Sequence, residues 1–276
     1  MAGRRSLIVS GGAQAVLAVI RLQQAEIARF LPEAAVARPE AVHRARVATR
    51  RIRSLLKTYG DLFEPGPLPS YRRNLARLAR WLEGVRETDV LSTLLLTVAG
   101  EAGLPQRAQQ RLRGALRAAQ SGARTDLRAQ LQTREWRSVV QELVPEEGAP
   151  GLVLREGGSD EQVLDLAART LIKCRKGLAQ RSHSPAELHA LRLRVKRCRY
   201  ALEPICSTRM RRGVGKVLRC LALMQTVLGA HRDTVLALRW LEQQAPALGL
   251  VTVRALAERL REGELQALAA LGLVPA

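Results

Sequence analysis

The sequence predicts an all-α protein, built as two four-helix bundles with internal pseudo-twofold symmetry and long antiparallel helical hairpins. Apolar residues recur at helical spacing along nearly the whole chain, and no stretch alternates as a β-strand would. Proline and glycine fall between the periodic segments, which is typical of helices joined by short connections. One segment also recurs 146 residues later in the chain, which indicates a duplicated half.

The helical period delimits the helices of each half. Before a loop rich in Pro, Gly and Glu, we expect helices near 13–31, 39–60, 69–84, 88–101, 105–132 and 134–143. After that loop we expect them near 160–180, 185–206, 208–229, 232–245 and 249–271. The third helix of each half is predicted to break at a glycine, near Gly84 and near Gly229.

The loop at about 144–159 divides what we expect to be a single domain, 1–276. It separates an N-terminal helical half, 1–146, from a C-terminal helical half, 147–276. A chain of this length can bury a substantial core, so each half has enough residues for about four packed helices.

Both copies of the repeat begin a helix with proline at its first position. Ser184-Pro185-Ala186-Glu187 matches a capping box, whereas Arg38-Pro39-Glu40 keeps the proline but has a poorer cap. His43 and His189 therefore sit about one turn into their helices, where the macrodipole still favours a nearby anion.

The chain carries a large excess of positive charge. Lys and Arg number 45 against 25 Asp and Glu, a formal net charge of +20, and only five of the bases are lysine. Residues 1–146 hold 24 bases and 13 acids, a net +11, and residues 147–276 hold 21 and 12, a net +9. Charge of this size repels itself in a compact protein, and the arginine fork suits phosphate oxygens, so the composition favours a polyanion partner.

The repeated segment places its bases in a stripe. With 100° per residue, the first stripe falls within about 80° of the helix circumference, opposite an apolar face; it consists of His43, Arg46, Arg50, Arg53 and Lys57. The second copy places His189, Arg192, Lys196 and Arg199 in the same way, and Arg51 and Arg197 are further repeated bases. A solvated helix face normally mixes acids with bases, and the first stripe has no acid. This absence favours a ligand-binding stripe over a solvated face.

The next helix of each half repeats the design in part. The first copy aligns Arg73, Arg77 and Arg80, and the second aligns Arg212, Lys216 and Arg219. The second half is thinner, because Glu203 stands where the first stripe has Lys57, so we expect the N-terminal stripe to bind more strongly.

Other features favour binding over catalysis. No carboxylate is placed on either stripe to orient His43 or His189 as a nucleophile or base. The repeated triplets Arg86-Glu87-Thr88 and Arg232-Asp233-Thr234 are interpreted as a helix N-cap with an interhelical ion pair. The four cysteines lack metal-ligand spacing and are expected to be buried free thiols, so we expect no metal and no cofactor.

The N-terminus is not expected to direct export. An apolar run follows Arg4-Arg5, but Gly11-Gly12 and Gln14 interrupt it and no A-x-A cleavage site follows. The run is also too short to span a bilayer. We therefore expect a cytoplasmic protein with no membrane partner.

The repeated motif resembles the signature of a known family. The segment Val42-His43-Arg44-Ala45-Arg46, with its continuation to Arg53, is similar to the histidine-led helix of the CHAD domain. Leu188-His189-Ala190-Leu191-Arg192 resembles the second-half counterpart, and Arg86-Glu87-Thr88-Asp89-Val90-Leu91 the motif that follows. The resemblance covers nearly the whole chain.

The resemblance implies two four-helix bundles that bind inorganic polyphosphate through bases on the central helices, with some relatives located on polyphosphate granules. By position it nominates His43, Arg46, Arg50, Arg53, His189, Arg192, Lys196 and Arg199, with Arg73, Arg77, Arg80, Lys216 and Arg219 as a second tier. The β-barrel and E-x-E-x-K motif of the triphosphate-tunnel domain, which many relatives carry, are absent from the sequence. We therefore expect a stand-alone member without that domain's hydrolase activity.

The expected function is thus non-catalytic binding of inorganic polyphosphate, and the protein is not expected to be an enzyme. The first alternative is a basic helical protein that binds nucleic acid, which a 3% aromatic content disfavours because single-strand binders stack bases on aromatic rings. The second is a phosphate-processing enzyme or metal protein that uses His43 and His189.

Overall fold

The protein is helical through nearly all of the described chain. The structure, a computed structural model, describes residues 11–144, 151–180, 182–207 and 213–275. Its helices confirm the all-α class: α1 (Gly12–Ala35), α2 (Pro39–Tyr59), α3 (Leu68–Trp81), α4 (Glu83–Glu101), α5 (Gln106–Leu131), α6 (Arg134–Leu143), α7 (Asp160–Leu178), α8 (Pro185–Leu202), α9 (Val214–Gln243), α10 (Ala245–Leu248) and α11 (Leu250–Ala269). Two 3-10 turns, η1 (Gly60–Leu62) and η2 (Pro204–Ser207), follow the ends of α2 and α8. Two residue pairs that were not expected as strands, β1 (Ser182–His183) and β2 (Val274–Pro275), pair in parallel.

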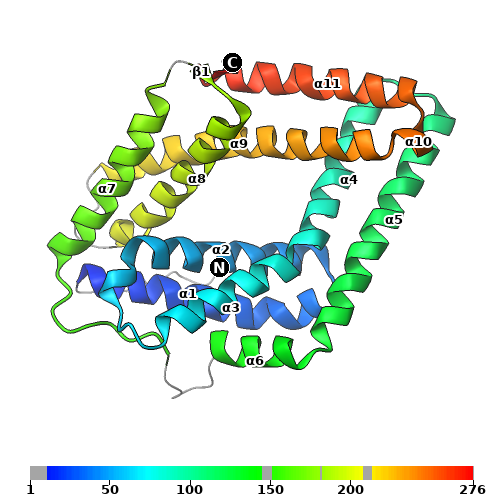
Figure 1. The fold of residues 1–276 in the computed structure, drawn as a ribbon. Coiled ribbons are helices and arrows are strands. Elements are labelled where there is room, and N and C mark those ends of the chain that lie inside the picture. Colours follow the sequence, from blue (N-terminus) through cyan, green and yellow to red (C-terminus); the bar gives the residue numbers. More distant parts are fainter. Residues whose placement is uncertain (1–10, 145–150, 181, 208–212, 276) are drawn as a thin grey trace, which may run out of the picture.

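The helices are arranged as the four sides of a frame (Figure 1). One side contains α1, α2, α3 and α6, and the opposite side is the antiparallel hairpin of α9 and α11. The antiparallel hairpin of α4 and α5 forms a third side, and α7 and α8 form the fourth. The long antiparallel hairpins expected from the sequence are therefore present.

Two clusters of buried side chains hold the frame together. The larger cluster joins α1, α2, α3 and α6 to α7, α8 and the first part of α9. The smaller cluster joins α4 and α5 to the second part of α9, α10 and α11. Each cluster draws on residues before and after the 144–159 loop, so helices from both parts of the chain share their apolar contacts.

The predicted break near Gly229 is wrong. Helix α9 runs without interruption from Val214 to Gln243, and Gly229 lies inside it. Glycine costs a helix interior only about 1 kcal/mol, which buried contacts on either side of it outweigh. Leu228 and Ala237 are both fully buried, one in each cluster, so packing keeps the helix continuous. In the first half a break does exist, but it falls at Leu82, and Gly84 belongs to α4.

Part of the 144–159 loop packs against the end of α2. Leu152 is buried, Leu154 bridges to Phe63, and the Arg155 amide donates to the Leu62 carbonyl at 2.9 Å. Residues 145–150 lie outside the described part. The loop therefore contributes one edge of the larger cluster.

The starts of the two repeated helices are as the sequence predicts. Ser184 and Glu187 form a reciprocal capping box at α8, and Pro185 and Pro39 occupy the first turns of α8 and α2. Arg38 makes no side-chain cap. Tyr59, fully buried at the end of α2, then donates a hydrogen bond from its hydroxyl to the Ala201 carbonyl of α8, at 2.5 Å.

Tyr59→Phe should lower the free energy of unfolding by about 1–3 kcal/mol, because it leaves the buried Ala201 carbonyl without this donor. The measurement is urea unfolding followed by circular dichroism. Tyr200→Phe is the control, because no described residue hydrogen-bonds to the Tyr200 hydroxyl and the ring that lies near Arg51 and Arg199 is kept. The free energy of unfolding of this variant should change by less than about 0.5 kcal/mol. Equal losses in both variants would contradict the assignment.

Candidate functional site

The two repeated helices present their stripes to one concave surface, here called the central groove. It consists of two adjoining pockets that share Arg46, Arg50, Arg192 and Arg232. Its walls come from α2, α3, α4, α8 and α9, and Figure 1 shows α2, α4, α8 and α9 bordering the middle of the frame. The groove therefore combines residues that are far apart in the sequence.

The structure brings ten of the predicted site residues together in this groove. They are His43, Arg46, Arg50, Arg53, Lys57, Arg80, His189, Arg192, Lys196 and Arg197. The other predicted residues with described positions do not line it: Arg51, Arg73, Arg77, Arg199, Lys216 and Arg219. Arg212 lies outside the described residues.

Two of the predicted bases are engaged in packing between α2 and α8. Arg51 and Arg199 both form ion pairs with Glu203, at 3.7 and 3.4 Å, and both guanidinium groups lie near the ring of Tyr200. Glu203 therefore neutralises bases from both copies of the repeat. The acid that interrupts the second stripe in the sequence therefore links α2 to α8 in the structure.

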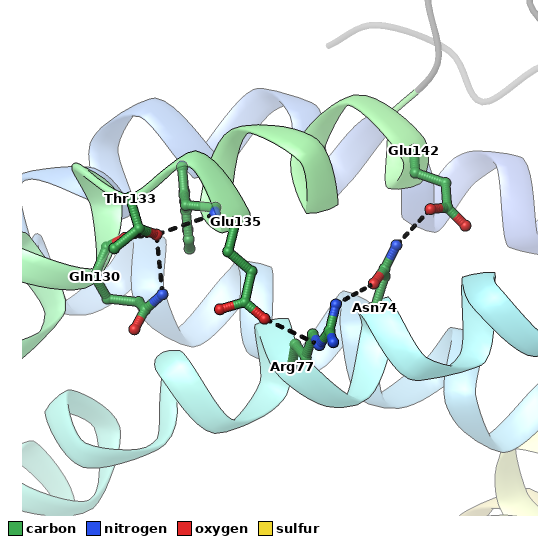
Figure 2. Close-up of polar contacts among 7 residues, drawn as sticks. Asn74, Arg77, Gln130, Thr133, Glu135 and Glu142 are labelled. Carbon is green, nitrogen blue, oxygen red and sulfur yellow. Dashed lines mark hydrogen bonds and ion pairs between the residues drawn. The ribbon is translucent and has the colours of Figure 1, made fainter.

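The base Arg77 is directed toward α6 and away from the groove. Its Nε lies 3.2 Å from Glu135, and its Nη1 donates to Asn74, which in turn donates to Glu142 (Figure 2). Thr133 caps the N-terminus of α6 beside this chain of contacts. Arg77 thus joins α3 to α6. Arg73, Lys216 and Arg219 are exposed on α3 and α9.

The groove also contains residues that the sequence interpretation treated as structural. Arg86 and Arg232 line it, together with the acids Glu83, Glu87 and Asp233. The expected interhelical pair is confirmed, because Arg232 of α9 lies 3.0 Å from Glu87 of α4. The repeat could have identified Arg86 and Arg232 as site residues, because they occupy equivalent positions in its two copies.

The expected N-caps at these triplets are wrong. Helix α4 begins at Glu83, and the Thr88 hydroxyl donates to carbonyls of the preceding turn, those of Gly84 and Val85. Thr234 is buried within the continuous helix α9. The triplets therefore lie inside helices, where Arg86 and Arg232 can point toward a neighbouring element.

Cations in the groove crowd one another. Lys196 is only 7% exposed, and burial followed by the charges of Arg50 and Arg192 lowers its pKa to about 6. Burial and the charge of Arg50 likewise lower the pKa of Arg192 to about 10. Arg50 is the neighbour common to both shifts, and burial followed by the charge of Arg50 also lowers the pKa of Arg46. A lysine with this pKa is largely neutral at pH 7.

Acids in the groove do not balance these bases. Ten Arg and Lys side chains line it against three acids. Arg46 pairs with Glu83 at 3.3 Å and donates to the Ala79 carbonyl at 3.2 Å, yet its Nε and that of Arg192 are buried without a hydrogen-bond partner among the described residues. Burial raises the pKa of Asp233, which weakens its ability to compensate.

Both histidines are poor bases in the free protein. Burial, and then the charge of Arg86, lowers the pKa of His43; burial, and then the charge of Arg232, lowers the pKa of His189. In the described part of the chain no carboxylate hydrogen-bonds to either ring. The surroundings of both histidines therefore disfavour the protonated imidazolium.

The cysteines follow the expectation only in part. Cys174 and Cys198 are buried, Cys206 is half-buried, and Cys220 is exposed on α9, which corrects the expectation that the thiols are all buried. Within the described ranges, no group of three or more His, Cys, Asp or Glu side chains could hold a metal ion. In the same residues, no helix has the length and apolar character needed to cross a membrane.

These features define an all-helical protein with a histidine-led basic groove. The match to the CHAD domain extends over residues 18–242, so the chain belongs to the CHAD domain family. The CHAD domain of the plant Ricinus communis is similar in structure, with a TM-score of 0.75 and 22% identity, over 98% of this chain and 94% of that chain. PptA from Streptomyces chartreusis is similar too, with a TM-score of 0.73 and 21% identity, over 95% of this chain and 96% of that chain.

Relatives in Mycobacterium tuberculosis are closer in sequence. The uncharacterized proteins MT2285, of strain CDC 1551, and Rv2226, of strain H37Rv, are each 31% identical to this chain over 222 residues, which is 75% of it. The matched part spans 41% of the length of either relative, so these relatives contain a large further portion.

Lys196→Met should raise the free energy of unfolding at pH 7 by about 1–3 kcal/mol, because folding of the parent must remove a proton from Lys196 or bury its charge, whereas a methionine of similar length carries no charge. Thermal unfolding at low salt measures the change. Because unfolding restores the ordinary pKa, the gain should grow as the pH falls from about 10 toward about 6. If the variant is no more stable than the parent, the conclusion that burial and neighbouring cations make Lys196 destabilising is wrong.

Proposed function

We propose that this protein binds inorganic polyphosphate in the central groove without catalysing a reaction. The observation that carries the proposal is the meeting of two stripes: Arg50 of α2 lies beside Arg192 and Lys196 of α8, and burial followed by the charge of Arg50 lowers the pKa values of both α8 residues. Such a cluster is relieved by a ligand that carries several negative charges. Association with polyphosphate in other members of the family supports the choice of ligand.

A linear chain of phosphates matches the linear arrangement of the bases in the groove. The bases lie in a row along α2 and α8, and each phosphate unit offers about one charge and two free oxygens. Arginine can pair with two such oxygens at once, while Lys57 and Lys196 act as point charges. Release of counterions from the chain would drive binding and make it depend on salt, as it does for nucleic acids.

We further propose that the two halves of this one domain are related by a pseudo-twofold axis, with helices of both halves in each of its two bundles. The shift of 146 residues maps α1 onto α7, α2 onto α8, α3 with α4 onto α9 and α5 onto α11. The axis would place the equivalent arginines Arg46 and Arg192, and Arg86 and Arg232, around the groove that they line. This correspondence of elements supports the proposal.

Nucleic-acid binding is less well supported. Tyr200 is the one aromatic residue that lines the groove within the described residues, and it is 3% exposed. Bases of a single strand would find no ring to stack on. An enzymatic or metal-dependent role is disfavoured by the lack of a carboxylate partner for His43 and His189, so the histidines are assigned as phosphate contacts. We also propose that the protein is located in the cytoplasm, in association with polyphosphate granules.

Arg50→Ala/Arg192→Ala should weaken polyphosphate binding by about 100-fold or more, because each arginine contributes charge-assisted hydrogen bonds worth about 1.5–3 kcal/mol. The slope of log K against log salt should also become shallower by about 2, one for each lost phosphate contact. Fluorescence competition with polyphosphate, duplex DNA and RNA at physiological salt makes the measurement.

Arg111→Ala/Arg117→Ala is the matched control, since it removes the same charge from exposed positions on α5. Its affinity should stay within about twofold of the parent. Equal affinity for the three polymers would refute selectivity for polyphosphate. Equal losses of affinity in the two double variants would refute the groove as the binding site.

Polyphosphate binding should be accompanied by proton uptake. The pKa values of Lys196, His43 and His189 are lowered in the free protein, and a bound polyanion raises them, so the complex holds more protons. Affinity should therefore increase as the pH falls from about 8.5 to about 6.5. Isothermal titration calorimetry in buffers of different ionisation enthalpy counts the protons.

Lys196→Met serves as the comparison, because the polyphosphate ligand titrates identically in both experiments. The variant should lose most of the uptake above pH 7 and keep the smaller part due to the histidines. Identical proton uptake by parent and variant would show that Lys196 does not meet the ligand.

A further inference from the structure

A second basic concavity, here called the outer pocket, lies between α2, α7 and α8. It is lined by Lys57, Thr58, Asp61, Leu166, Arg169, Thr170, Lys173, Lys176, Arg194 and Arg197. Six of these ten residues are bases and one is an acid. Four of the bases, on α7 and at Arg194, are outside the set that the repeated motif nominates.

The bases of the outer pocket are largely uncompensated. Arg169 forms an i,i+4 ion pair with Asp165, at 2.8 Å. The other five bases form no ion pair with a described residue, and Asp61 is the single acid in the lining. A solvated helix surface usually mixes both signs, so this arrangement indicates an anion-binding surface.

The fold directs these bases toward one another. Lys173 and Lys176 are three residues apart on α7, and Arg194 and Arg197 are three apart on α8, so each pair shares a helix face. A Cβ atom at Gly177 would come within 2.8 Å of the Arg194 guanidinium. The absence of a side chain at Gly177 therefore lets Arg194 lie directly against α7.

The outer pocket is continuous with the central groove. Lys57 and Arg197 line both of them, one on α2 and the other on α8. Figure 1 shows α7 and α8 side by side on the same side of the frame. A chain that follows the stripe of α2 to its end at Lys57 therefore reaches the bases of α7.

We propose that the outer pocket is a second phosphate-binding site for the same polyphosphate chain, which passes from the central groove over Lys57 and Arg197 onto α7. This inference rests on the proposed function. A chain held in the groove presents its next phosphates to the outer pocket at high effective concentration, so the second contact adds affinity without a second association event. The two sites together would make this protein select long chains over short ones.

The test compares tripolyphosphate with long-chain polyphosphate on Lys173→Ala/Lys176→Ala/Arg194→Ala. These three residues are exposed and line the outer pocket but not the groove, so the variant should fold normally, as thermal unfolding will check. We expect about a tenfold or larger loss of affinity for the long chain and less than a twofold change for tripolyphosphate. Arg107→Ala/Arg111→Ala/Arg117→Ala, on α5, removes the same charge and should change neither.

The possible results separate the two proposals. If the outer variant binds the long chain as tightly as the parent, the outer site is wrong while the groove stands. If Arg50→Ala/Arg192→Ala leaves tripolyphosphate binding unchanged, the groove itself is wrong. Equal losses in the outer and α5 variants would show a general effect of net charge and would overturn the outer site.

Discussion

The structure depends on apolar packing that holds like charges together. On one face of α2, the buried side chains Ile52, Leu55 and Tyr59 belong to the larger core cluster, and Tyr59 also bonds to α8. The opposite face carries Arg46 and Arg50 toward the bases of α8. Burying a leucine or isoleucine side chain contributes about 1.5–3 kcal/mol, and the larger cluster buries many such side chains around α2 and α8. The core can therefore maintain a cluster of cations that would otherwise separate, and under the proposed function a polyanion would relieve the repulsion that remains.

The stripe of α2 depends only on the spacing of residues within one helix, so it could be predicted from the sequence. His43, Arg46 and Arg50 share a face because of the helical period alone, and the structure places all three in the groove. The capping box at Ser184 is equally local. The direction of a side chain that contacts a neighbouring helix was harder to predict from the sequence. Arg77 has the spacing of a stripe residue but faces α6. Arg51 pairs with Glu203 because the C-terminal end of α8 places that acid beside α2.

The residues that sequence reasoning missed depend on the course of α9. A break at Gly229 would separate Arg232 from the helix that positions it, and for this reason the sequence pattern favours a cap at the Arg232-Asp233-Thr234 triplet. In the continuous helix, two neighbours fix the orientation of this turn. His231 hydrogen-bonds to Glu264 of α11, and Arg232 pairs with Glu87 of α4. Local propensity says little about such contacts, because the packing of Leu228 and Ala237 into separate clusters keeps the helix intact.

A continuous α9 also explains why the groove can be preorganised. The helix belongs to both core clusters, so it spans the frame as one rigid element with Arg232 between its two anchored ends. A flexible joint near Gly229 would let the cations of α8 and α9 move apart and relieve their repulsion in the free state. A rigid α9 prevents that relaxation, so the repulsion between the cations of α8 and α9 persists in the free protein. Binding of the proposed polyphosphate ligand would then cost little in the ordering of side chains, and the relief of repulsion would add directly to affinity.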